Sequence, residues 1–90
     1  DLDVYEHIRL WPNLIAVHRH NPRADDQFWH GNPYWVKLKL RDTHAMKSYL
    51  TMTGGEREIE LAAFLSPEER IELKHMIEDA LKRIQAPARY

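Results

Sequence analysis

The sequence predicts an α+β fold, an antiparallel sheet of about five strands covered on its apolar face by one C-terminal helix. Apolar and polar residues alternate through much of the region 4–62, as half-buried strands require. Glycine, proline and asparagine divide that region into short segments. From about residue 66 to 85, apolar residues recur every three or four positions, as in an amphipathic helix. We expect a reduced relative of the pleckstrin-like folds.

The length and composition fit one small domain over residues 1–90, ending in a frayed tail at 86–90. The chain has no cysteine, which excludes disulfides and thiolate metal sites. Its net charge of −1 provides no overall field for nucleic acid, which we do not expect as a partner. No apolar run reaches the length of about 18 residues that a membrane span requires. The chain starts at Asp1 without an initiator methionine, which we interpret as a piece of a longer protein.

The first predicted element is a hairpin of strands Val4–Leu10 and Leu14–His20, with a turn at 11–13. One register makes one face uniformly apolar, and a slip by one residue would mix the two faces. Because Pro12 does not fit a simple type I′ turn, we expect a bulge near it. The predicted pairs are Leu10 with Ile15, Ile8 with Val17, and Glu6 with Arg19.

Two strands are predicted next. A polar loop at 21–26 leads to a short strand at 27–30, which Gly31-Asn32-Pro33 ends. Tyr34 then begins a strand that runs to Arg41. Its alternation directs one set of side chains into the core and the other set outward. The inward set is Val36, Leu38 and Leu40, and the outward set is Trp35, Lys37, Lys39 and Arg41.

A second hairpin and the helix complete the prediction. The hairpin joins strands at 48–53 and 57–62 through Gly54-Gly55, because glycine adopts the positive φ that a tight turn needs. Ser66 is the predicted N-cap of the helix, with Pro67 at the first helical position and Glu69 closing a capping box. The apolar stripe of the helix consists of Leu73, Ile77, Ala80, Leu81 and Ile84.

The outward residues Trp35, Lys37, Lys39 and Arg41 are the candidate contact face. A tryptophan beside basic side chains is suited to phosphate groups such as those of an anionic lipid surface. The alternative is an ordinary solvated sheet face. On the helix, Ile71 and Met76 lie off the apolar stripe and form a second, smaller candidate for contact with a partner.

Histidines form the second unusual feature. In the predicted register, His7 lies opposite His18 and Tyr5 opposite His20, all on the polar face of the first hairpin. Two imidazoles at alternate positions of a strand suit Zn²⁺, Cu²⁺ or Ni²⁺, and imidazole also titrates near neutral pH. The sequence offers no evident carboxylate to complete the set, and ordinary surface histidines are the alternative.

The sequence provides no catalytic set. Glu68 and Glu69 lie in the first turn of the helix, where capping explains them better than acid–base catalysis. Gly54-Gly55 lacks the lysine and the strand-to-helix context of a phosphate loop. We therefore expect a non-enzymatic domain without a cofactor.

Three segments of the chain occur together in a specific order and spacing. They are Asn32-Pro33-Tyr34-Trp35-Val36, then Tyr49-Leu50-Thr51 with Gly54-Gly55 and Arg57-Glu58-Ile59-Glu60-Leu61, and finally Phe64-Leu65-Ser66-Pro67-Glu68-Glu69-Arg70. Together they resemble the domain of unknown function 2244 family, a group of small inner-membrane proteins common in alphaproteobacteria. The resemblance extends over roughly residues 5–84. Ala62 stands where the resemblance implies a glycine, so this position has a less permissive backbone.

The resemblance implies a pair of transmembrane helices upstream and a soluble C-terminal domain on the cytoplasmic side of the bacterial inner membrane. It assigns no activity and no catalytic residue. We therefore expect a protein-binding or assembly module with a membrane-protein partner. The alternatives are a sensor of anionic lipid that uses Trp35, Lys37 and Lys39, and a metal or pH sensor that uses His7, His18 and His20.

Overall fold

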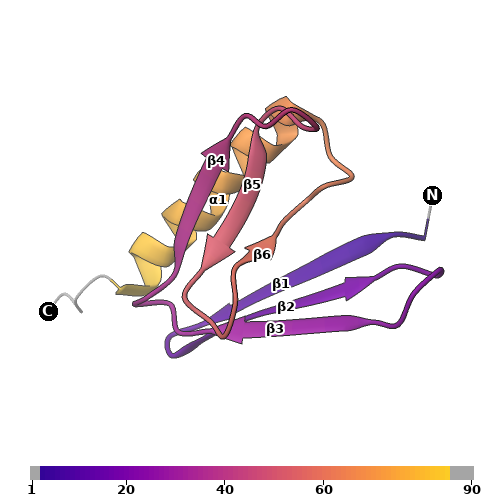
Figure 1. Cartoon of the computed structure of the whole chain (residues 1–90). Helices are drawn as coiled ribbons and strands as arrows, with labels where there is room; N and C mark the ends of the chain where they lie inside the picture. The colour runs from indigo at the N-terminus through magenta and orange to yellow at the C-terminus, as the bar shows by residue number, and fades with distance from the viewer. Residues whose placement is uncertain (1–2, 86–90) are drawn as a thin grey trace, which may run out of the picture.

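A computed structural model describes residues 3–85 of the chain. The predicted tail at 86–90 lies outside these residues. The strands are β1 (Tyr5–Trp11), β2 (Leu14–His20), β3 (Gln27–Gly31), β4 (Lys37–Arg41), β5 (Tyr49–Thr53) and β6 (Ile59–Glu60), and the helix is α1 (Pro67–Gln85) (Figure 1).

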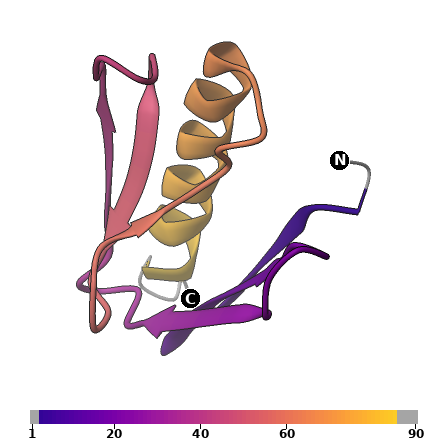
Figure 2. The ribbon, with the colours of Figure 1, turned by 45° about the vertical axis from the view of Figure 1, so that its right-hand side comes forward.

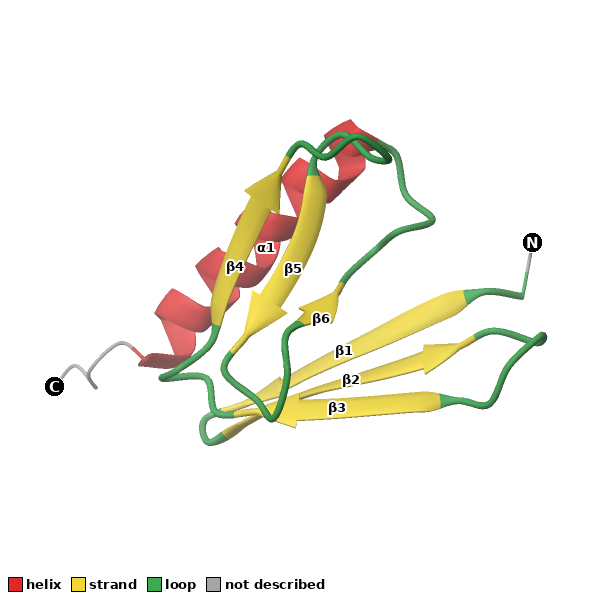
Figure 3. Ribbon diagram, viewed as in Figure 1, coloured by secondary structure: helices red, strands yellow, loops and turns green. Residues whose placement is uncertain are grey.

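The strands form two antiparallel sheets of three strands, β1-β2-β3 and β4-β5-β6 (Figure 3). The prediction of a single sheet of about five strands is therefore wrong. The chain breaks between β3 and β4 because Asn32 organises a turn. Its side-chain Oδ1 accepts the N–H of Tyr34 at 2.9 Å, and its carbonyl accepts the N–H of Trp35 at 2.9 Å. The strand that we predicted to begin at Tyr34 consequently begins at Lys37.

The two sheets meet at one corner. Gly31 and Gly55 form an isolated antiparallel bridge there. A β-carbon on either glycine would overlap the backbone of the opposite segment, so the close approach requires glycine. The buried Trp29 strengthens this junction by donating its indole N–H to the carbonyl of Arg57 at 2.8 Å.

The predicted register of the first hairpin is confirmed. Leu10 pairs with Ile15, Ile8 with Val17, and Glu6 with Arg19. The predicted bulge is absent, because pairing continues without interruption to Trp11 and Leu14. Neither Pro12 nor Asn13 has a positive φ, so the fixed φ of proline fits a two-residue turn.

The second hairpin forms as predicted, between β5 and β6, but its second strand is shorter than predicted. Gly54 has a φ of 113° at its turn, as expected for glycine, and β6 contains only two residues. The strand ends because Ala62 adopts a left-handed conformation with a φ of 57°. The Oε1 of Glu6 accepts the N–H of Ala62 at 2.8 Å, and its Oε2 pairs with Arg19 at 2.8 Å.

Helix α1 begins as predicted. Ser66 Oγ accepts the N–H of Glu69 at 3.1 Å, and Glu69 Oε1 accepts the N–H of Ser66 at 2.9 Å. These bonds to Ser66 lower the pKa of Glu69, because they favour its ionised form.

The core lies between α1 and the inner faces of the two sheets. Figure 2 shows α1 beside β4 and β5 and on one side of β1–β3, whose other side is uncovered. Val36 and Leu38 are buried and Leu40 is half-buried, as predicted. The buried apolar residues are Ile15, Val17, Trp29, Val36, Leu38, Leu50, Met52, Ile59, Leu61, Ala62, Ile77 and Leu81.

Arg70 is a buried residue that the sequence did not indicate. It lies in the first turns of α1 with 4% of its surface exposed. Its guanidinium donates hydrogen bonds only to backbone carbonyls within residues 3–85, and these belong to the two loops that flank the helix start. The acceptors are Lys47 and Ser48 in one loop and Ala63 and Leu65 in the other.

Candidate functional site

The uncovered side of the first sheet is the most unusual surface of the domain. Alternation along β1, β2 and β3 directs Ile8, Ile15 and Val17 inward and the side chains at the alternate positions outward. We call the outward surface the aromatic–histidine face. It consists of Tyr5, His7, Arg9, Trp11, Leu14, Ala16, His18, His20, Phe28 and His30.

Large aromatic side chains on this face are exposed to solvent. Phe28 is 67% exposed, Trp11 43% and Tyr5 38%. Single exposed apolar residues are common on soluble domains, whereas several on one face typically mark a binding surface. The outward side of β4, by comparison, carries Lys37, Lys39 and Arg41. The two sheets therefore present outer surfaces of different chemistry.

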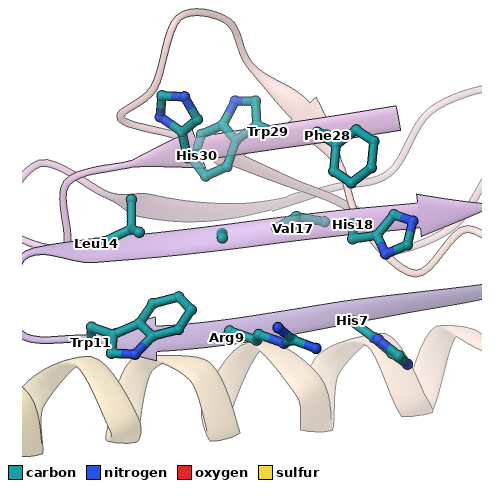
Figure 4. A pocket seen from close by; sticks show the side chains of 10 residues that line it. His7, Arg9, Trp11, Leu14, Val17, His18, Phe28, Trp29 and His30 are labelled. Atoms are coloured by element: carbon teal, nitrogen blue, oxygen red, sulfur yellow. The ribbon is translucent and has the colours of Figure 1, made fainter. Parts of the chain in front are cut away.

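A groove of about 480 Å³ runs along the aromatic–histidine face (Figure 4). In Figure 4 the side chains of Trp11, Arg9 and His7 follow one another along β1, so the guanidinium lies between two rings. Within residues 3–85 no aspartate or glutamate lines the groove, and Arg9 forms no ion pair. The lining residues are His7, Arg9, Trp11, Leu14, Ala16, Val17, His18, Phe28, Trp29 and His30.

The structure brings His7, His18 and His20 together on this face, as the register predicted. The rings of His7 and His18 lie 6.1 Å apart between centroids. The sequence reasoning missed Asp26, which the loop after β2 places beside them. Its two oxygens lie 2.7 Å from His18 Nε2 and 2.7 Å from His20 Nδ1. The hydrogen bonds from His18 and then His20 lower the pKa of Asp26 below its usual value.

The three candidate histidines are engaged by neighbouring side chains. Within residues 3–85, no three histidine, aspartate or glutamate side chains are grouped so that they could hold a metal ion. Two of the three candidate imidazoles direct a nitrogen at Asp26, and the rings also stack on neighbours, His18 on Phe28 at 4.6 Å and His20 on Tyr5 at 5.0 Å between centroids. These contacts link β1, β2, β3 and the adjoining loop.

The predicted contact face is divided by the break before β4. Trp35 is 71% exposed but lies in the turn before β4, separate from the three basic side chains that alternate on the strand. Arg41 pairs with Glu58 at 3.3 Å, which neutralises part of the basic character. Lys37 and Lys39 are exposed and form no ion pair within residues 3–85.

The helix candidates lie at a smaller crevice. Met76 is 66% exposed and Ile71 37% exposed. Met76, but not Ile71, borders an apolar crevice of about 220 Å³ between α1 and the first hairpin. The structure therefore does not unite the two residues in one patch.

Comparisons with known proteins identify one match. A family model described as integral membrane protein, domain of unknown function 2244, matches residues 1–81. No solved structure and no curated protein matches the chain, so the kinship with pleckstrin-like folds stays a prediction. No helix within residues 3–85 is long and apolar enough to cross a bilayer. Because the family model covers most of the sequence, the chain belongs to the domain of unknown function 2244 family of integral membrane proteins.

Proposed function

We propose that this domain is a non-enzymatic binding module on the cytoplasmic side of the bacterial inner membrane, where it holds or helps to assemble a membrane-protein partner. The aromatic–histidine face is the proposed contact surface. The observation that carries the proposal is the groove, whose lining combines the exposed Trp11 and Phe28 with an unpaired Arg9. Aromatic residues and arginine are the side chains that most often dominate the energy of protein interfaces.

Membership of a family of integral membrane proteins supports a role at a membrane. The cytoplasmic side follows from the pair of transmembrane helices that the family resemblance implies, because two spans return the chain to the side from which it started. The binding role follows from surface chemistry. A domain selected for solubility alone gains nothing from several exposed aromatic side chains on one sheet face.

Site-specific photo-cross-linking in membranes tests this proposal. In the full-length protein, p-benzoylphenylalanine replaces Phe28 in one variant and Tyr34 in a second. Both side chains are 67% exposed, so they differ in location and not in access to solvent. We expect a discrete protein adduct from position 28 and none from position 34. The proposal is wrong if irradiation gives no adduct at position 28, or the same adducts at both positions.

A sensor of anionic lipid is the second candidate, and the exposed, unpaired Lys37 and Lys39 support it together with Trp35. Flotation with anionic and neutral vesicles, at low and physiological salt, distinguishes it from the first. Salt-sensitive flotation that Lys37→Glu with Lys39→Glu abolishes supports lipid recognition. Absence of flotation under every condition excludes it for this domain.

A further inference from the structure

We infer that the segment bound by the aromatic–histidine face is an acidic amphipathic helix of a protein partner. This inference rests on the binding function proposed above and specifies the chemistry of the partner. It follows from the charge of the groove, from its dimensions and from the placement of its apolar side chains.

The charge of the groove requires an acid from the partner. Arg9 is exposed, and no carboxylate within residues 3–85 reaches it. Asp26, at the far end of the face, is already engaged by His18 and His20. A partner that covers Arg9 removes it from water, and a covered guanidinium without a hydrogen-bond acceptor strongly disfavours binding. An aspartate or glutamate of the partner, placed over Arg9, offsets this loss of hydration by forming a bidentate ion pair with the guanidinium.

The dimensions of the groove fit one helix. Three strands span two interstrand spacings, about 10 Å, which matches the diameter of a helix with its side chains, about 10–12 Å. The distance along β1 from His7 to Trp11 is four residues, or about 14 Å. A helix covers that distance in about nine residues. The predicted segment therefore makes two to three turns over the groove.

The apolar side chains set the pattern of the partner helix. Trp11 and Leu14 lie at one end of the groove and Phe28 lies toward the other, with Arg9 between them (Figure 4). A matching helix places apolar residues at positions i and i+7, and an acid at i+3 or i+4 between them. A bilayer fits less well, because a flat surface leaves a hollow of about 480 Å³ unfilled.

The test extends the cross-linking experiment with changes at Arg9. Variants Arg9→Glu and Arg9→Lys each carry p-benzoylphenylalanine at position 28 in the full-length protein. We expect Arg9→Glu to reduce the adduct about tenfold or more, because like charges now face each other, and Arg9→Lys to retain most of it. Arg83→Glu changes an exposed arginine of α1 that does not line the groove, and it should leave the yield unchanged. Circular dichroism of each variant verifies that the domain is folded.

Mass spectrometry of the adduct reads the partner sequence directly. The inference is supported when the cross-linked peptide has an aspartate or glutamate between apolar residues at helical spacing and when Arg9→Glu suppresses the adduct. It is overturned when the adduct survives Arg9→Glu, or when the peptide is basic or lacks that spacing. An adduct with lipid or with a second copy of this chain also overturns it. Absence of any adduct at position 28 refutes the binding function itself, so the two failures are distinct.

Discussion

Replacing the buried Arg70 with methionine is expected to be among the most destabilising single substitutions in this domain. Arg70 Nε donates to the carbonyl of Ser48 at 2.9 Å, and Nη2 donates to the carbonyl of Lys47 at 2.6 Å. Nη1 donates to Leu65 and, more weakly, to Ala63 at 3.4 Å. These bonds tie the loop between β4 and β5 to the loop that precedes α1. Methionine replaces the aliphatic part of the arginine side chain but leaves these four backbone carbonyls without their hydrogen-bond donor.

The magnitude follows from three good hydrogen bonds to a charged group, each with a net value of about 1.5 kcal/mol. Removing a buried charge recovers part of its desolvation cost, which lowers the expected loss to about 3–4 kcal/mol. A domain of 90 residues has a free energy of unfolding of roughly 5–13 kcal/mol. The change therefore removes a large part of the stability, and the melting temperature should fall by at least about 12 °C.

Urea unfolding followed by tryptophan fluorescence measures this loss, and circular dichroism gives the melting temperature. Arg83→Met in the same helix is the matched control, because Arg83 is exposed, and it should cost less than about 0.5 kcal/mol. Arg70→Lys should lose most of the stability that Arg70→Met loses, because one ammonium group does not reproduce the planar fork of donors. The reasoning is refuted if Arg70→Met and Arg83→Met unfold at the same urea concentration.

Three further predictions concern single features of the fold. Ala62→Gly should raise the free energy of unfolding by about 0.5–1 kcal/mol in urea unfolding, because glycine adopts the φ of 57° without strain, and a loss of stability would contradict this. The lowered pKa of Asp26 means that its interactions stabilise the fold above the unfolded-state pKa of 3.8 and are lost as pH falls through the lower folded-state value. In Asp26→Asn, the urea concentration at half-unfolding should therefore decrease less as the pH falls through that acidic range. The same pH dependence in the variant and the original protein would contradict this role of Asp26. Added Zn²⁺ should leave the melting temperature unchanged at pH 7.5, because His18 and His20 are bound to Asp26; a rise of several degrees would restore the metal-sensor alternative.

The elements with strong local patterns were predictable from the sequence. The apolar alternation of the first hairpin fixed its register, because a slip by one residue would have exposed Ile8 and buried polar side chains. Ser66, Pro67 and Glu69 likewise located the start of α1. The paired strands of the hairpin are joined by a short turn, and the capping residues lie within three positions of each other. The local sequence pattern is therefore enough to specify both features.

The features that depend on longer-range geometry were not predictable. The alternation from Tyr34 to Arg41 indicated one continuous strand. The side chain of Asn32 instead stabilises a turn, and β4 begins only at Lys37. Asp26 was recognised only as part of a polar loop, and its bonds to His18 and His20 depend on how that loop folds back. The burial of Arg70 could not be predicted, because its hydrogen-bond partners are backbone carbonyls, which every residue has.

The division into two sheets is what makes the proposed binding face possible. Helix α1 covers inner surfaces of both sheets, so each sheet keeps one outer surface. If solubility alone had shaped these surfaces, both would resemble the charged outer side of β4. The outer side of the first sheet instead combines exposed Trp11 and Phe28 with an Arg9 that no carboxylate within residues 3–85 neutralises. Such a surface is poorly suited to water, and its chemistry is best explained by a partner that supplies both apolar cover and a negative charge.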